Sequence, residues 1–192
     1  MRRPDPVLRA RRIDQILRAS IPVFAQRGYE GTTMANIAAA AGVSRPALYQ
    51  YFGDRSELFG TAFRLLLEES TDQALNALAQ ATSLADQLDG YLQRLSGDAY
   101  ASLAETAFGD ELMDARHQFA ADAAADAIRR AHDGLRTHLQ QHSSADQQTR
   151  NDAFELLTLS LAGLKQDQPT PKTYRRRLTF LAQTTAHALT AH

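Results

Sequence analysis

The chain has 192 residues and a formal net charge of −1, and this length suits one sizeable core or a small domain joined to a larger one. It contains no cysteine, which excludes disulfides and cysteine-ligated zinc or iron–sulfur sites. No apolar run approaches the length of a membrane span and the arginine-rich start is not a secretory signal, so we expect a soluble, cytoplasmic protein without membrane contact.

The sequence predicts an all-helical chain, because alternating β-branched residues are missing and alanine, leucine and glutamine dominate. Glycine, serine and proline clusters mark the expected helix ends. About nine helices are predicted, over residues 8–27, 34–41, 45–51, 55–80, 84–95, 98–108, 111–141, 146–166 and 172–190.

The first predicted helix carries one apolar stripe and ends before Gly28, which can serve as its C-cap. Pro22 lies inside this helix, where the missing backbone donor is expected to bend it. Residues spaced by 4, 4 and 3 share one helical face, and the stripe consists of Ile13, Leu17, Ile21 and Phe24.

Two short helices joined by a tight turn follow, and together they predict a helix-turn-helix. Thr33 can cap the first helix and Ser44 the second, with Pro46 in a first turn where a missing N–H does no harm. Gly42 permits the turn, and the second helix of such a pair fits the major groove of DNA. The residues expected to face inward are Ile37, Ala38, Ala41, Val43, Leu48 and Phe52.

The next helix is expected to start with a capping box formed by Asp54 and Glu57.

Charge divides unevenly between the two parts of the chain. Residues 1–60 hold nine arginines against five acidic residues, whereas residues 61–192 hold twelve basic against seventeen acidic residues. A basic front on an acidic body suits contact with a polyanion.

The sequence resembles the TetR family of one-component transcriptional regulators over about residues 10–60. Two departures stand out: Pro22 in the first helix, and Arg45-Pro46 where a small or lysine–glycine pair is commoner, so the DNA sequence read cannot be carried over. The resemblance rests on Phe24, Gly28, Thr33, Ile37, Ala38, the turn Ala41-Gly42-Val43-Ser44, Leu48-Tyr49, Tyr51-Phe52, Arg55 and Leu58.

The resemblance implies a three-helix DNA-binding domain in residues 1–60 and a helical ligand-binding and dimerisation domain in residues 61–192. It implies phosphate contacts for Thr33, Tyr49 and Arg55. Arg45 and Gln50 are the candidates for base edges, since arginine pairs with guanine and glutamine with adenine. The alternative is that Tyr49 packs on the surface and Arg45 is solvated. The expected contact set is completed by Ser44, Pro46, Ala47 and Tyr51.

The last two predicted helices are candidates for the dimer interface, because 146–166 is apolar around most of its circumference. Paired with their twofold copies they would form a four-helix bundle. The alternative is that both helices belong to the core of one protomer. The predicted interface residues are Phe154, Leu157, Leu161, Leu164, Leu178, Leu181, Thr185 and Leu189.

A ligand pocket is expected among the middle helices, although each candidate residue also suits plain core. Asp110, Asp114 and His117 share one helical face and could hold a divalent cation, but a solvated face explains them better, so we expect no metal and no cofactor. His138 and His142 are expected at the surface. The pocket candidates are Tyr91, Tyr100, Phe108, Met113, His117, Phe119 and Phe154.

The resulting hypothesis is a repressor that binds a palindromic operator as a homodimer and is released by a small-molecule effector. One alternative is a constitutive or architectural DNA-binding protein, which would not need a body of this size. The other is an enzyme, but no phosphate loop, nucleophile elbow or paired-carboxylate arrangement is present. The sequence specifies neither the effector nor the operator, and it does not separate repression from activation.

Overall fold

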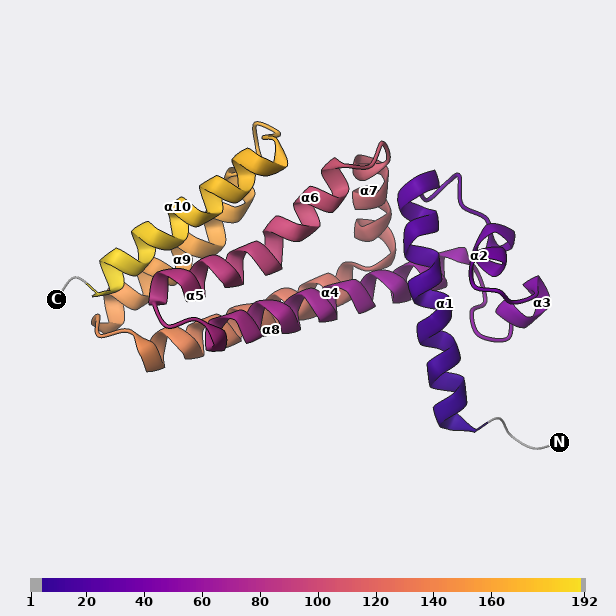
Figure 1. The fold of residues 1–192 in the computed structure, drawn as a ribbon, viewed down its shortest axis with the longest axis horizontal. Coiled ribbons are helices and arrows are strands. Elements are labelled where there is room, and N and C mark those ends of the chain that lie inside the picture. The colour runs from indigo at the N-terminus through magenta and orange to yellow at the C-terminus, as the bar shows by residue number, and fades with distance from the viewer. Residues whose placement is uncertain (1–4, 191–192) are drawn as a thin grey trace. The chain divides into compact units, whose positions relative to one another are not determined.

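The structure is a computed structural model that describes residues 5–190, and within them every element is a helix, which confirms the all-α fold (Figure 1). Residues 1–4 and 191–192 of the two predicted domains lie outside this range. The elements are α1 (Pro6–Arg27), α2 (Met34–Ala40), α3 (Arg45–Leu48), α4 (Arg55–Gln80), α5 (Leu84–Leu92), the π-helical η1 (Gln93–Gly97), α6 (Asp98–Ala104), α7 (Gly109–Phe119), α8 (Ala121–His142), α9 (Gln147–Gly163) and α10 (Pro171–Thr190).

Two predicted helix boundaries in the middle of the chain are wrong. The single helix expected over residues 111–141 is interrupted at Ala120, whose φ of −138° and ψ of 19° lie outside the helical region. The break expected at Ser96–Gly97 is instead the π turn η1, which continues α5 into α6. Ser96 and Gly97 are both buried in this turn.

The helices pack as two compact units. The first runs to Leu67 and also includes Glu105–Ala124; the second consists of Glu68–Ala104 and the chain from Ala125 onward. The division predicted after residue 60 does not anticipate that a later segment, containing α7, packs with the N-terminal helices.

The first unit contains α1, α2, α3, the start of α4, and α7. Its centre is an aromatic cluster in which the ring centroid of Phe59 lies 5.0 Å from Phe24 and 5.2 Å from Tyr29. Phe119 of α7 joins the cluster at 4.9 Å from Tyr29. A carboxylate oxygen of Glu111 accepts a hydrogen bond from the Glu30 amide at 2.7 Å, so α7 also fixes the turn between α1 and α2.

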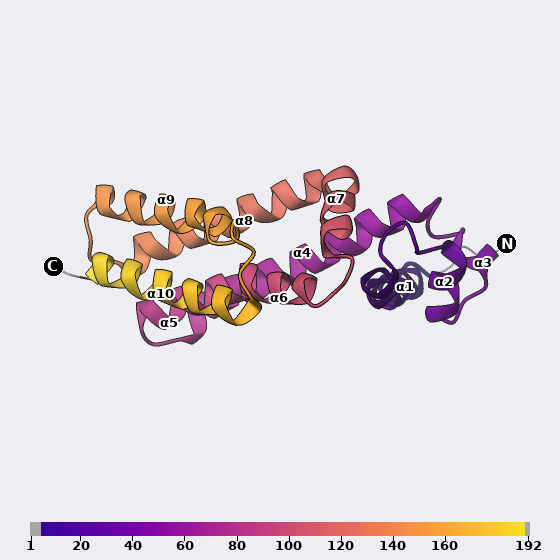
Figure 2. The same cartoon turned by 90° about the horizontal axis from the view of Figure 1, so that it is seen from above.

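The second unit is built around α10, which packs against α5, η1 and α9 (Figure 2). Two buried tyrosines are satisfied inside it: the Tyr91 hydroxyl donates to the Ala131 carbonyl at 3.0 Å, and the hydroxyls of Tyr174 and Ser96 lie 2.8 Å apart. Across residues 5–190, no helix combines the length and the apolar character needed to cross a bilayer.

Candidate functional site

The helix-turn-helix forms through the caps that the sequence predicts. The Thr33 hydroxyl accepts from the Asn36 amide at 3.2 Å, and the Asn36 side chain accepts from the Thr33 amide at 3.0 Å, which closes a capping box. The Ser44 hydroxyl accepts from the Ala47 amide at 3.2 Å and starts α3. Gly42 has a φ of +65°, the left-handed conformation that favours glycine in a tight turn.

The inward face of this motif is largely as expected. Ile37, Leu48 and Phe52 are buried, while Val43 is only half-buried. The predicted helix 45–51 is shorter in the structure, because α3 ends at Leu48. A turn follows, in which the Tyr51 amide donates to the Leu48 carbonyl at 3.0 Å.

The outward face of α3 carries side chains suited to hydrogen bonding with a polar partner. The Arg45 guanidinium lies 5.7 Å from the Tyr49 ring centroid and 3.4 Å from the Tyr49 hydroxyl. No ion pair joins Arg45 to an acidic side chain in the part of the chain that the structure describes, so its charge is not neutralised there. The exposed members of the predicted contact set are Thr33, Ser44, Arg45, Pro46, Tyr49 and Gln50, and Ala47 is half-buried.

Arg55, expected to meet phosphate, is occupied inside the first unit. One terminal nitrogen donates to the carbonyls of Glu30 and Thr32 at 3.0 and 2.9 Å, and the other pairs with the Glu30 carboxylate at 3.0 Å. The guanidinium carbon lies 4.0 Å from the Tyr29 ring centroid. Partial burial acts to lower the pKa of Arg55, but the hydrogen bonds with Glu30 and Tyr29 outweigh it and hold the pKa above its ordinary value.

The start of α4 departs slightly from the expected capping box. The Asp54 carboxylate accepts from the Glu57 amide at 2.8 Å, as predicted, but the Glu57 carboxylate accepts from Gly53 at 2.6 Å rather than from Asp54. Hydrogen bonds from Ser56 and from the Glu57 amide lower the pKa of Asp54.

The predicted dimer interface needs correction, because most of its residues face the core of their own unit. Leu157, Leu178 and Leu189 have no exposed surface, Thr185 retains 2% and Phe154 retains 9%. Such side chains cannot contact a second copy. Leu161, Leu164 and Leu181 are partly buried against the same core.

The apolar side chains that do face outward on α9 and α10 are different ones. Leu156 is 53% exposed, Leu159 is 73% exposed and Phe180 is 70% exposed. They occupy the helical faces opposite the buried leucines, and the sequence analysis assigned these residues no role at an interface.

The predicted pocket residues are divided between the two units. Phe108, Met113, His117 and Phe119 belong to the first unit, and Tyr91, Tyr100 and Phe154 to the second. Tyr91 and Phe154 are buried, which favours the plain-core alternative for both.

Tyr100, another predicted pocket residue, holds the loop before α10, since its hydroxyl donates to the Pro169 carbonyl at 2.7 Å. Asp110, Asp114 and His117 are all exposed on α7, and within residues 5–190 no three potential ligands gather closely enough to hold a metal ion.

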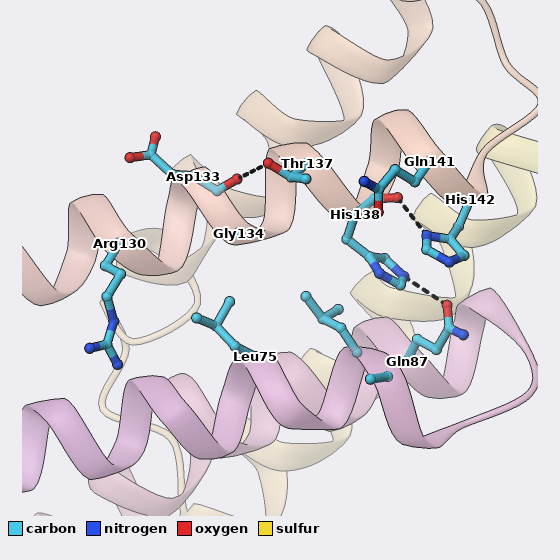
Figure 3. A pocket seen from close by; sticks show the side chains of 11 residues that line it. Leu75, Gln87, Arg130, Asp133, Gly134, Thr137, His138, Gln141 and His142 are labelled. Carbon is cyan, nitrogen blue, oxygen red and sulfur yellow. Dashed lines mark hydrogen bonds between the residues drawn. The ribbon is translucent and has the colours of Figure 1, made fainter.

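A hollow of about 690 Å³ lies within the second unit, between α4, α5 and α8 (Figure 3). Its apolar base comes from α4, and its polar rim comes from α5 and α8. None of these side chains was predicted to line a pocket. The lining residues are Leu75, Leu78, Ala79, Gln87, Arg130, Asp133, Gly134, Thr137, His138, Gln141 and His142.

Two stacked imidazoles form one end of this hollow, and His138 is buried rather than at the surface as expected. The Gln87 amide nitrogen donates to the Ala81 carbonyl at 2.8 Å, which leaves its oxygen to accept from His138 at 2.8 Å. His142 donates to the His138 carbonyl at 3.1 Å, and the two rings lie 4.2 Å apart. Burial, and to a smaller extent His142, lowers the pKa of His138.

Comparison with known proteins identifies relatives of the helix-turn-helix. Residues 16–62 match the family described as bacterial regulatory proteins, tetR family. The chain is 38% identical over 80 residues to the HTH-type transcriptional activator FasR of Mycolicibacterium smegmatis, which covers 42% of this chain and 35% of that protein. It is 39% identical over 70 residues to the HTH-type transcriptional regulator PksA of Bacillus subtilis, which covers 36% of this chain and 34% of that protein.

Solved structures extend the likeness to the whole fold. A TetR transcription regulator from Haloarcula marismortui is similar with a TM-score of 0.69 and 16% identity, over 94% of this chain and 98% of that chain. A TetR transcriptional regulator from Streptomyces coelicolor is similar with a TM-score of 0.60 and 24% identity, over 93% and 98%. The sequence matches, by contrast, span only about a third of the curated relatives, as the 35% and 34% coverages show.

Proposed function

We propose, from the match of residues 16–62 to the TetR family of bacterial regulatory proteins, that the chain is a DNA-binding transcription regulator and not an enzyme. The observation that carries the proposal is the exposed face of α3. There Arg45 projects from a helix whose opposite face is anchored by the buried Leu48, and Tyr49 and Gln50 are exposed directly after this helix. A helix of this kind can enter the major groove and present its side chains to base edges.

The proposed contacts are of two kinds, with base edges and with the sugar–phosphate backbone of DNA. Arg45 and Gln50 are proposed to read bases, and Pro46 and Ala47 are proposed to touch thymine methyl groups. Thr33, Ser44, Tyr49 and Tyr51 are proposed to hold the backbone through their hydroxyls. Arg55 is left out of this set, because its guanidinium is committed to Glu30, Thr32 and Tyr29.

The regulator is proposed to act as a homodimer on a palindromic operator. The outward apolar side chains Leu156 and Leu159 of α9 and Phe180 of α10 supply the contact surface in this proposal. Large exposed apolar side chains on adjacent helices are typical of surfaces that a partner covers. A twofold axis places the same patch on both copies and mirrors the symmetry of a palindrome.

Release by a small molecule completes the proposal, with the hollow between α4, α5 and α8 as the candidate effector site. Its volume of about 690 Å³ lies within the usual range for small-molecule sites, which runs from about 300 to 1,000 Å³. An effector can shift DNA affinity only by as much as it prefers one state of the protein over the other. Repression is the proposed outcome, although the related FasR is named an activator.

The test is selection of bound duplexes from a random DNA pool, followed by binding assays on the enriched sequence. We expect enrichment of a palindromic site bound by two copies of the chain. A pool that stays random through successive rounds would exclude sequence-specific regulation and favour an architectural role. Compounds that raise the melting temperature should then be added to the protein–DNA complex, where an effector is expected to lower the affinity.

A further inference from the structure

The first two turns of α1 extend beyond what the core of their unit requires. All residues from Asp5 to Arg12 are exposed, and the buried residues of α1 begin at Ile16. The start of this helix is nevertheless stabilised by an N-cap, since the Asp5 carboxylate accepts a hydrogen bond from the Val7 amide at 2.9 Å and Pro6 occupies the first turn. A capped, exposed and basic extension therefore needs an explanation other than packing.

The orientation of this extension follows from the helical repeat. Arg9 and Arg12 share a face of α1 with Ile16, because these positions are three and four residues apart. Ile16 is fully buried within the unit that contains α2 and α3, so the two arginines project on the same side, beyond the end of the core. The Arg9 guanidinium accordingly lies 5.5 Å from the ring centroid of Tyr51, directly after α3.

The charge of these two arginines is not cancelled by nearby acids. The Asp5 carboxylate is used as a cap, and Asp14 is paired with Arg18 at 3.0 Å. Arg12 donates to the neutral side chain of Gln15 at 2.9 Å, and Arg9 faces an aromatic ring. An aromatic partner restricts a guanidinium without neutralising it, which leaves the positive charge for an external anion.

We propose that Arg9 and Arg12 form a second DNA-contacting surface, which binds the sugar–phosphate backbone beside the base pairs that α3 reads. The inference rests on the proposed DNA-binding function and adds an element outside the helix-turn-helix. Its occupant is duplex DNA, because the surface is basic and is continuous, through Tyr51, with the outward face of α3. Phosphate contacts of this kind strengthen binding to every sequence alike.

The experiment measures affinity against salt for the full chain, on the selected operator and on a random-sequence duplex of about 30 base pairs, which is three helical turns. Each phosphate contact contributes about 0.9 to the slope of log affinity against log salt. Between 50 and 200 mM salt, one contact is therefore worth about a 3.5-fold change in affinity. Arg9→Ala and Arg12→Ala should each lower the slope by about one contact on both duplexes, with base preference unchanged.

Two variants serve as controls. Arg9→Lys keeps the charge and should keep the wild-type slope, whereas Arg27→Ala removes an exposed arginine from the other end of α1 and should also leave the slope unchanged. If the slope of Arg9→Ala equals that of wild type, the inference is overturned while DNA binding stands. If Arg9→Ala impairs binding to anionic lipid vesicles but not to DNA, the surface binds membranes instead. If wild type binds no duplex at all, the proposed function itself fails.

Discussion

Replacement of Arg55 by alanine is expected to destabilise the first unit in the absence of DNA. The substitution removes two hydrogen bonds to the carbonyls of Glu30 and Thr32, an ion pair with the Glu30 carboxylate and a stacking contact with Tyr29. Hydrogen bonds from a charged donor contribute about 1.5–3 kcal/mol each, and the exposed ion pair contributes less than about 1 kcal/mol. Because the Arg55 side chain is only 26% exposed, we expect a loss of about 2–4 kcal/mol after solvent replaces part of these contacts.

Hydrogen exchange is the suitable assay, because it reports the two units separately. Amides of Ile37 and Ala38 in α2 should exchange about 30-fold to 1,000-fold faster in Arg55→Ala, as a loss of 2–4 kcal/mol implies. Amides of Leu135 and Leu139 in the second unit serve as the internal reference. Unchanged protection of α2 in Arg55→Ala would refute the assignment of Arg55 as an internal clamp and restore it as a phosphate ligand.

Three further outcomes are expected. Arg45→Ala should cost about 1–3 kcal/mol on the operator and flatten the preference at one base pair per half-site, whereas profiles that keep every preference would exclude base reading. Leu159→Arg should convert the dimer to a monomer, as measured by sedimentation. Gln140→Arg, at an exposed position of α8, should leave the dimer intact. A Leu159→Arg variant that remains dimeric would mean that the interface lies elsewhere. Because burial lowers the folded pKa of His138 below 6.5, the unfolded chain binds more protons than the folded chain as pH falls through that value. The free energy of unfolding should therefore decrease as pH falls below about 6.5, and it should decrease less in His138→Gln. An equal decrease in both proteins would contradict this.

The helix-turn-helix could be predicted from the sequence because its signals are local. Thr33 and Ser44 stand three residues from the amides that they cap, and Gly42 stands where the backbone needs a positive φ. Inward positions such as Ile37 and Leu48 follow from a helical repeat over a few residues. Even here the prediction assigned Ile16 no role, although it is fully buried in α1.

Contacts between distant segments could not be predicted in the same way. Glu111 accepts a hydrogen bond from Glu30, and Phe119 packs against Tyr29, across more than eighty residues of sequence. Nothing in the local pattern of residues 105–124 distinguishes a helix that packs with the N-terminal unit from one that packs with the body. The internal contacts of Arg55 were missed for the same reason, since its partners lie on a loop more than twenty residues earlier.

The helices α9 and α10 show a limit that arises from composition rather than distance. A helix with leucine at positions 156, 157, 159, 161 and 164 is apolar on several sides, so its repeat does not say which side meets its own core. Packing of α9 against α10 and the shared core buries Leu157, whereas the adjacent Leu156 stays 53% exposed and Leu159, two residues further on, stays 73% exposed. If the buried set formed the dimer contact, each protomer would have to open its own core before it could associate. The exposed set needs no such rearrangement, and the two arrangements therefore differ in whether a folded monomer can exist before the dimer forms.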